Sequence, residues 1–165
     1  MTNPLKINKK IKPFNKTINI DGDKSLSIRW ALLASQASGR SKAYGILNSE
    51  DVLNTLGCLK KLGVKINLKK KYCEIEGKGL NSYQYKNNIT LNAGNSGTCA
   101  RLILGLLVHS KKKIKLIGDK SLSKRDFSRI TIPLQSFGAK FYSRKKKLPL
   151  TIIGSKLAQP INYIE

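Results

Sequence analysis

The sequence predicts an α/β protein made of two βαβαββ units that follow one another in the chain. Strand-like and helix-like segments alternate, and their order in the first half recurs in the second. The segment "LKKLGVKI" (59–66) also aligns with "LQSFGAKF" (134–141). This alignment places Gly63 and Gly138 at equivalent helix ends and gives a repeat of roughly seventy-five residues.

The first unit is expected at about 17–77, after an N-terminal segment of residues 1–16. "KTINI" (16–20) predicts a short strand, and a mostly apolar helix follows over 25–37, stopped by Gly39. "SKAYGIL" (41–47) predicts a second strand. Asn48 to Asp51 then offer a capping group and first-turn acids for a helix that ends at Gly63. "VKINL" (64–68) and "YCEIEG" (72–77) predict two closing strands.

The second unit is expected at about 88–154. "NITL" (88–91) predicts a strand, "SGTCARLILGLLV" (96–108) a helix and "KIKLIG" (113–118) a strand. A helix over 126–138 follows and contains Pro133, which is tolerable as a kink or an early-turn residue. Strands at 139–143 and 148–154 close the unit, and residues 157–165 are expected to begin a third.

Composition indicates an ordinary folded domain. The chain has 165 residues, of which 40% are hydrophobic and 25% charged, and this balance excludes a disordered chain. The longest apolar run, Leu102 to Val108, is too short to cross a bilayer. The N-terminal "MTNPLKINKK" leads into no apolar segment of a secretory signal. We therefore expect a cytoplasmic protein.

The cysteines and the single histidine limit the possible chemistry. Three cysteines without CxxC spacing favour free thiols in a reducing compartment over a zinc site or a disulfide framework. His109 is the only histidine, and it follows a helical apolar run. A Ser-His-Asp triad or a multi-histidine metal site would therefore lack the residues it needs.

The charge is strongly positive, with 32 Lys and Arg against 9 Asp and Glu, a net charge of +23. Such a balance attracts anions, including nucleic acid, membrane headgroups and phosphorylated metabolites. The lysine clusters "LKKKYC", "SKKKIK" and "SRKKKL" resemble solvated turns and strand ends, and aromatic residues do not alternate with them. The pattern favours a small anionic ligand, with a basic nucleic-acid-binding module as an alternative.

One octapeptide occurs almost unchanged at two places, as "GDKSLSIR" (22–29) and "GDKSLSKR" (118–125). In the first copy a strand ends and a helix begins, so unpaired backbone N–H groups face outward. Lys24, Ser25 and Arg29 could add a point charge, a hydroxyl donor and a bidentate grip on phosphate or carboxylate. The alternative is a capped helix with two solvated cations.

Two further stretches could bind the same kind of ligand. "NAGNSGTCAR" (92–101) carries two glycines that allow close backbone approach to a ligand, although it lacks P-loop spacing and also suits a simple helix cap. In the second octapeptide Arg125 precedes a helix, where local pairing with Asp126 is the alternative. All three stretches lie between a strand and a helix, and such loops gather at one edge of a layered α/β unit. We therefore predict that Lys24 and Arg125 face one cleft, with the helix after Gly97 pointing into it.

These motifs resemble the EPSP synthases (3-phosphoshikimate 1-carboxyvinyltransferases). The matching stretches are "GDKSLSIRWALLAS", "NSEDVLNTLGCLKKLGV", "GNSGTCARLILGLL" and "GDKSLSKRDFSRITIPLQSFGAK", in this order, and the resemblance runs from about Thr17 to the C-terminus. It implies the enolpyruvyl transferase fold of repeated βαβαββ units. It also implies transfer of the enolpyruvyl group of phosphoenolpyruvate to the 5-hydroxyl of shikimate-3-phosphate in the shikimate pathway of aromatic amino acid biosynthesis, with no metal or organic cofactor.

The resemblance assigns roles to residues by position. Lys24 would be catalytic and touch both substrates, whereas Ser25 and Arg29 would hold shikimate-3-phosphate. The backbone N–H group of Gly97 and the guanidinium of Arg125 would bind phosphoenolpyruvate. The side chains of Asn95 and Thr98 would shape this pocket. Charge neutralisation and positioning of two anions would then carry much of the catalysis.

This chain also departs from the family. Asp21 and Asp126 stand where prolines are usual, and each adds a carboxylate beside a cationic group. The family is much longer and places its active site between two domains. The resemblance therefore implies a truncated N-terminal fragment, inactive alone, with a complementary C-terminal half as a candidate partner. The sister enzyme that acts on UDP-N-acetylglucosamine is the alternative within the fold, and Ser25 favours shikimate because the sister enzyme carries Asn there.

Overall fold

The computed structural model describes residues 6, 8–10, 12–18, 20–157 and 159–163. The first unit contains two helices and three strands: α1 (Lys24–Gln36), β1 (Ser38–Tyr44), α2 (Glu50–Lys61), β2 (Lys65–Leu68) and β3 (Tyr72–Lys78). The second contains β4 (Ile89–Asn92), α3 (Gly97–Leu106), β5 (Ile114–Ile117), the 3₁₀ turn η1 (Leu122–Lys124), α4 (Ser128–Ser136), β6 (Lys140–Ser143) and β7 (Leu150–Ile153).

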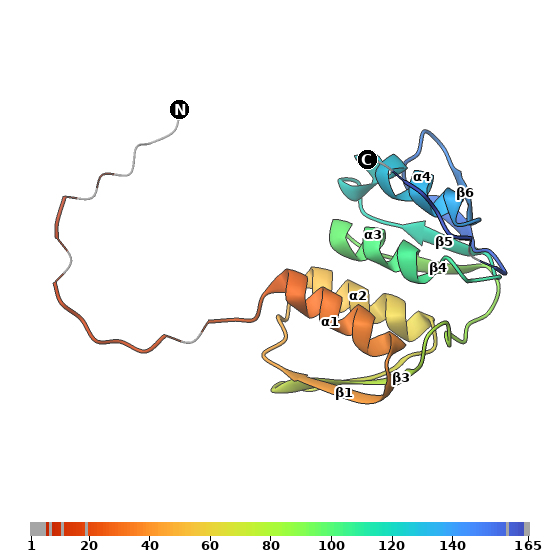
Figure 1. Ribbon diagram of the computed structural model, residues 1–165. Coiled ribbons are helices and arrows are strands. Elements are labelled where there is room, and N and C mark those ends of the chain that lie inside the picture. The colour runs from red at the N-terminus through yellow and green to blue at the C-terminus, as the bar shows by residue number, and fades with distance from the viewer. Residues whose placement is uncertain (1–5, 7, 11, 19, 158, 164–165) are drawn as a thin grey trace.

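The two units have matching sheets. The first sheet has the order β1-β3-β2 and is antiparallel, while the second has the order β4-β5-β7-β6 with β4 parallel to β5. The order β5-β7-β6 repeats β1-β3-β2, and its pairings are antiparallel as well. In Figure 1, α1, α2 and α3 lie between the two sheets. This arrangement confirms the predicted α/β fold with two repeated units.

The helices bury their apolar residues in one core that both units share. Ile28 of α1, Leu59 of α2 and Ile103 of α3 are fully buried in it. Burying each such side chain contributes about 1.5–3 kcal/mol, so this packing fixes the three helices against one another. Among the described residues, no helix combines the length and the apolar character that crossing a membrane requires.

The two predicted helix ends at Gly63 and Gly138 have the same geometry. Both glycines have a positive φ, +88° and +94°, which favours glycine over residues with a Cβ. The Gly63 N–H group donates to the Lys60 carbonyl at 3.0 Å, and the Gly138 N–H group donates to the Gln135 carbonyl at 2.8 Å. In each case the following residue donates to the carbonyl one position earlier, as in a Schellman motif. The local signal for the repeat is therefore confirmed.

The strand predicted at 16–20 is wrong for the residues that the structure describes there, which are 16–18 and 20. Ile18 and Ile20 are 74% and 85% exposed. In the second unit the equivalent strand, β4, pairs with β5, where Ile114 and Leu116 are buried. The equivalent edge here belongs to β1, "SGRSKAY", which is polar and mostly exposed. It offers an added strand little apolar surface to cover.

Other boundaries also differ from the prediction. The strand expected at 41–47 lies at 38–44 and includes Gly39, so Gly39 lies inside β1 and the helix ends at Gln36. α4 starts two residues later than expected and contains Pro133, as predicted. The described residues from 157 onward, 157 and 159–163, form no regular element. Their assignment to a third unit stays a prediction.

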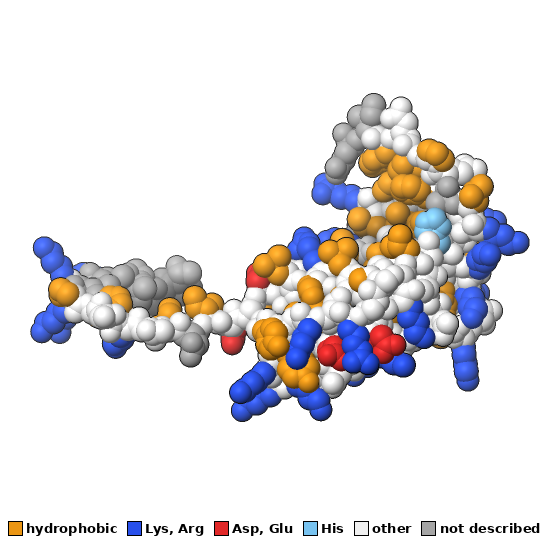
Figure 2. Space-filling model, turned by 60° about the horizontal axis from the view of Figure 1, so that its bottom comes forward, with side chains coloured by type: hydrophobic (Ala, Val, Ile, Leu, Met, Phe, Trp, Pro, Cys, Tyr) orange, Lys and Arg blue, Asp and Glu red, His pale blue; other side chains and the backbone are white. Residues whose placement is uncertain are grey.

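Basic side chains are spread in small groups over the surface. Figure 2 brings the underside of Figure 1 forward, and Lys and Arg lie around its margin, along the N-terminal segment and beside acidic side chains. Lys65 and Glu76 form an ion pair with 3.6 Å between Nζ and Oε1. On the described residues of this face, the basic side chains stand in separate groups and form no continuous stripe of the kind that follows a nucleic-acid backbone.

Candidate functional site

Five of the predicted site residues line a single open cavity of about 460 Å³. It lies where α1, α2 and α3 begin and where η1 ends. Its lining comprises Lys24, Glu50, Asp51, Asn95, Gly97, Thr98, Arg101 and Arg125, and we call it the cationic cleft. The predicted convergence of Lys24, the α3 N-terminus and Arg125 on one cleft is confirmed. Three helix N-termini beside three cations make the cleft suited to anions.

Local packing fixes the start of α1 and with it Lys24. The Asp23 carboxylate caps the helix by accepting from the Leu26 N–H group at 2.7 Å. Gly22 lies so close to the end of β1 that an added Cβ would stand 1.8 Å from the Gly45 carbonyl oxygen. The Ser27 hydroxyl joins the same loop by accepting from the Leu47 N–H group at 3.1 Å. These contacts hold the first turn of α1 at the mouth of the cationic cleft.

The second octapeptide uses the same cap. The Asp119 carboxylate accepts from the Leu122 N–H group at 2.7 Å. Asp23 caps α1 in the same way, and each aspartate stands three residues before the N–H group from which it accepts. The Ser123 N–H group then donates to the Asp119 carbonyl at 3.0 Å, as the corresponding serine of the first copy does to Asp23. The sequence repeat therefore encodes a repeated way of starting a helical turn. The first copy continues as α1, whereas the second stops after η1.

The two octapeptides supply different cations to the cationic cleft. The first contributes its lysine, Lys24, while its arginine, Arg29, lies exposed on α1 and outside the lining. The second contributes its arginine, Arg125, while its lysine, Lys120, is exposed and also lies outside the lining. The two octapeptides stand at different places in the fold, one at the start of α1 and the other between β5 and α4, so corresponding positions do not both line the cleft.

The α3 N-terminus forms the anion-binding wall of the cleft. The Ser96 hydroxyl caps the helix by accepting from the Cys99 N–H group at 3.2 Å, and Ser96 is fully buried. A Cβ on Gly97 would stand 2.9 Å from Nη1 of Arg125. The missing side chain therefore lets the guanidinium lie against the helix start, where an anion would meet a backbone N–H group and a fixed positive charge together.

A carboxylate partly balances the positive charge. Lys24 Nζ lies 3.1 Å from Oδ2 of Asp51, and the Asp51 side chain is 20% exposed. Asp51 and Glu50 stand in the first turn of α2, where acidic side chains interact favourably with the helix dipole. The ion pair holds Lys24 over the cleft. Lys24 therefore pairs with a carboxylate of another helix, and not with the neighbouring carboxylate of Asp21.

Asp126 is also turned away from the neighbouring arginine. Its carboxylate accepts from the Ser128 N–H group at 2.5 Å and from the Ser128 hydroxyl. These hydrogen bonds hold the pKa of Asp126 below its ordinary value. Within the described part of the chain, Arg125 takes part in no ion pair. The Asp126 carboxylate therefore binds the first residue of α4 and does not pair with the Arg125 guanidinium.

Sequence reasoning missed some cleft residues and assigned others that lie outside it. Arg101 lines the cleft one turn after Gly97, and its guanidinium carbon lies 5.9 Å from the Phe127 ring centroid. Arg101 stands four residues after Gly97 and therefore lies on the same face of the helix, which is the sequence feature that could have predicted its position. Ser25 and Arg29 are not among the lining residues: Ser25 is half-buried and Arg29 is exposed one turn further along α1. Their role in binding stays a prediction.

The cysteines take no direct part in the cleft. All three are free thiols and buried, as predicted for the thiol state. The interaction with the Cys99 thiol, together with burial, raises the pKa of Cys58 far above its ordinary value. The Cys58 thiol also donates to the Asn92 carbonyl at 3.3 Å. The pair joins α2 to α3 just behind the cationic cleft and does not present a nucleophile to it.

Comparison with known proteins agrees with the motifs. A family model described as EPSP synthase (3-phosphoshikimate 1-carboxyvinyltransferase) matches residues 8–163. The chain is 40% identical over 161 residues to the 3-phosphoshikimate 1-carboxyvinyltransferase of Streptococcus mutans, covering 96% of this chain and 38% of the relative. A Streptococcus pyogenes serotype M2 protein of the same name is also 40% identical, with coverages of 96% and 37%.

Solved structures give the same result for the fold. The EPSP synthase from Acinetobacter baumannii superposes with a TM-score of 0.81 and 35% sequence identity, over 88% of this chain and 33% of that chain. The chain therefore spans between a third and two fifths of the length of these proteins. Because the family model covers residues 8–163 and the motif residues meet in one cleft, the chain belongs to the EPSP synthase family.

Proposed function

We propose that this chain supplies the N-terminal part of a 3-phosphoshikimate 1-carboxyvinyltransferase. The whole enzyme would transfer the enolpyruvyl group of phosphoenolpyruvate to the 5-hydroxyl of shikimate-3-phosphate. The observation that carries the proposal is the convergence of Lys24, Arg125 and the α3 N-terminus on the cationic cleft. The family match favours this substrate pair over UDP-N-acetylglucosamine chemistry.

The phosphoenolpyruvate site would lie at the α3 N-terminus. Its carboxylate or phosphate would accept from the Gly97 N–H group and from the guanidinium of Arg125, which already lies against that glycine. Asn95 and Thr98 line the same wall and would orient the anion. Arg101, one turn further on, would add a second guanidinium to the pocket.

Shikimate-3-phosphate would bind toward α1. Ser25 and Arg29 stand one turn apart on this helix, so both could reach one phosphate or carboxylate group. Lys24 precedes Ser25 and points into the cationic cleft, where it would contact both substrates. The Lys24–Asp51 ion pair would hold the ammonium between them.

The reaction proposed for this site conserves all atoms and charges. A proton adds to the methylene carbon of phosphoenolpyruvate, and the 5-hydroxyl oxygen forms a bond to the adjacent carbon while losing its own proton. The bond from that carbon to the phosphate oxygen then breaks, and loss of a methyl proton restores the enol ether. Residues of this chain would bind and orient the anions and stabilise the leaving phosphate. Groups from the remaining length would complete the proton transfers.

The exposed apolar residues fit a larger assembly. Leu26 and Leu33, seven positions apart on α1, are 68% and 69% exposed, and Leu102 of α3 is 39% exposed. Side chains seven positions apart lie on the same helix face. We assign this face to packing against the remaining length of the enzyme, either a third unit that begins at 157 or a complementary C-terminal half. We place the enzyme in the cytoplasm, which the three free thiols support.

Phosphate release measures the proposed reaction. The chain alone is expected to release no phosphate from phosphoenolpyruvate with shikimate-3-phosphate present, and to bind shikimate-3-phosphate with a Kd well above micromolar. Addition of the C-terminal portion of the Streptococcus mutans relative is expected to produce release that requires both substrates. Release by the chain alone would contradict the division of the site between two portions.

A matched pair of variants tests the cationic cleft in that mixture. Lys24→Gln removes the cleft lysine, and Lys120→Gln removes the corresponding lysine of the second octapeptide, which lies outside the cleft. Lys24→Gln is expected to lower kcat/KM by at least a hundredfold, since it removes a charge from both substrate sites. Lys120→Gln is expected to leave it unchanged. Equal effects of the two substitutions would refute the assignment.

A further inference from the structure

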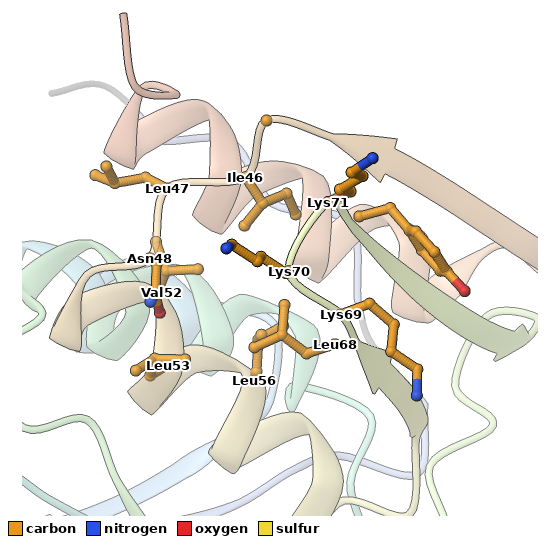
Figure 3. A pocket seen from close by; sticks show the side chains of 12 residues that line it. Ile46, Leu47, Asn48, Val52, Leu53, Leu56, Leu68, Lys69, Lys70 and Lys71 are labelled. Carbon is orange, nitrogen blue, oxygen red and sulfur yellow. The ribbon is translucent and has the colours of Figure 1, made fainter.

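A second cavity, also of about 460 Å³, lies beside the first turns of α2. Its walls are the loop from β1 to α2, the N-terminal half of α2 and the hairpin between β2 and β3 (Figure 3). It shares no lining residue with the cationic cleft. We call it the hairpin pocket. None of its lining residues has a role in the proposed reaction.

The bed of the hairpin pocket is apolar. Val52 and Leu56 of α2 form a buried floor, with exposures of 1% and 3%. Leu53 and Leu68 stand at the edges and are 44% and 41% exposed, and Ile46 closes the side formed by the loop. The half-exposed leucines and the buried floor form an apolar surface. A ligand that covers this surface would be stabilised by removing it from water.

The rim of the hairpin pocket is cationic. Lys69, Lys70 and Lys71 form the tip of the hairpin, and no acidic residue lines the pocket. Figure 3 shows the Lys70 side chain extending over the pocket toward Ile46 and Leu47, whereas Lys69 and Lys71 point away. In the part of the chain that the structure describes, the Lys70 ammonium belongs to no ion pair. One uncompensated positive charge therefore stands over an apolar bed.

We propose that the hairpin pocket binds a free anionic amphiphile, a single molecule with a carboxylate or phosphate group and an aliphatic body. The anionic group would pair with Lys70, and the aliphatic body would cover Leu53, Leu56 and Leu68. The cavity volume lies within the range of about 300–1,000 Å³ for small-molecule sites, which are mostly apolar with a few placed polar groups. A sugar phosphate would leave the leucines uncovered, and a neutral alkane would leave the ammonium unpaired.

Titration with three probes that share an eight-carbon chain and differ in charge separates these alternatives. Octanoate, octan-1-ol and octyltrimethylammonium are added to the ¹⁵N-labelled chain, and backbone amide shifts are followed. Octanoate is expected to saturate at one molecule per chain and to shift amides of the loop 45–48 and the hairpin 68–72. Octan-1-ol is expected to bind at least threefold more weakly, and the cation weaker still. Equal binding of octanoate and octan-1-ol, or shifts away from these segments, would overturn the proposal.

Two variants locate the charge. Lys70→Gln is expected to weaken octanoate binding by up to about fivefold, the upper range for an exposed ion pair, and to leave octan-1-ol binding unchanged. Lys145→Gln, in the basic hairpin of the second unit and outside this pocket, is the matched control and is expected to change neither. A Lys70→Gln variant that binds octanoate like the parent overturns the proposal. Cosedimentation with anionic phosphatidylglycerol vesicles without octanoate binding also overturns it, because the site would then recognise a membrane surface.

Discussion

Gly97→Ala should separate ligand binding from folding stability. The new methyl group would stand 2.9 Å from Nη1 of Arg125, and its next neighbours are 3.8 Å or more away. The crowded atom is the end of a flexible side chain, so the guanidinium can move aside at little cost. We therefore expect a free energy of unfolding within about 0.5 kcal/mol of the parent.

The same displacement should weaken anion binding strongly. Moving Arg125 off the α3 N-terminus removes one charge-assisted hydrogen bond, worth about 1.5–3 kcal/mol. This corresponds to a roughly ten- to hundredfold increase in the Kd for phosphoenolpyruvate. Affinity is measured by NMR titration, which resolves millimolar binding, and stability by urea denaturation of the same samples.

Gly105→Ala, in the same helix, is the control. A Cβ there meets nothing within 4 Å, and the position lies inside α3. Alanine should therefore stabilise the chain by about 0.5–1 kcal/mol through helix propensity and leave the Kd unchanged. If Gly97→Ala binds phosphoenolpyruvate as tightly as the parent, contact between Arg125 and the α3 N-terminus does not matter for binding, and the reasoning fails.

Three further outcomes test the elements that support the site. Gly22→Ala should lower the urea midpoint by an amount equivalent to about 1–3 kcal/mol, because its Cβ would collide with the Gly45 carbonyl 1.8 Å away; an unchanged midpoint would contradict this. The pKa of Asp126 is lowered, so its hydrogen bonds to Ser128 stabilise the fold above the ordinary pKa of 3.8 and are lost as pH falls through the folded value. The Asp126→Asn variant should therefore lose less folding stability than the parent on acidification. If the free energy of unfolding falls equally with pH in both proteins, this expectation is wrong. The three buried thiols should resist a thiol reagent until guanidinium unfolds the chain, and rapid labelling of the native protein would show that the core opens.

Features set by local chemistry were predictable from the sequence. The helix ends at Gly63 and Gly138 depend on a positive φ and nearby carbonyl groups, so the same short pattern produces the same motif in both units. The octapeptide likewise carries its own aspartate cap, seen at Asp23 and Asp119. The loops after β4 and β5 gather at one end of the second sheet, as expected for strand-to-helix loops, and bring the α3 N-terminus and Arg125 together. The start of α1 brings Lys24 to the same cleft, although no strand precedes it among the described residues.

Features that depend on distant partners were not predictable in this way. A strand at 16–20 needs an apolar neighbouring edge, and the polar β1 does not provide one. Asp51 reaches Lys24 only because α1 and α2 pack together, and Arg101 enters the cleft only through the orientation of α3. Which cation of each octapeptide lines the cleft depends on where that copy stands in the fold, at the start of α1 or between β5 and α4. Each of these contacts depends on residues that are far apart in the sequence, so no single stretch of the sequence predicts it.

The location of phosphoenolpyruvate on the chain tests the central claim most directly. In an amide-shift titration of the full chain, the largest changes should fall on Asn95, Gly97, Thr98 and Arg125, and they should be absent in Lys24→Gln at the same ligand concentration but present in Lys120→Gln. Shifts spread over the lysine-rich hairpins, equal in both variants, would mean that the cationic cleft is no specific anion site and would contradict the account.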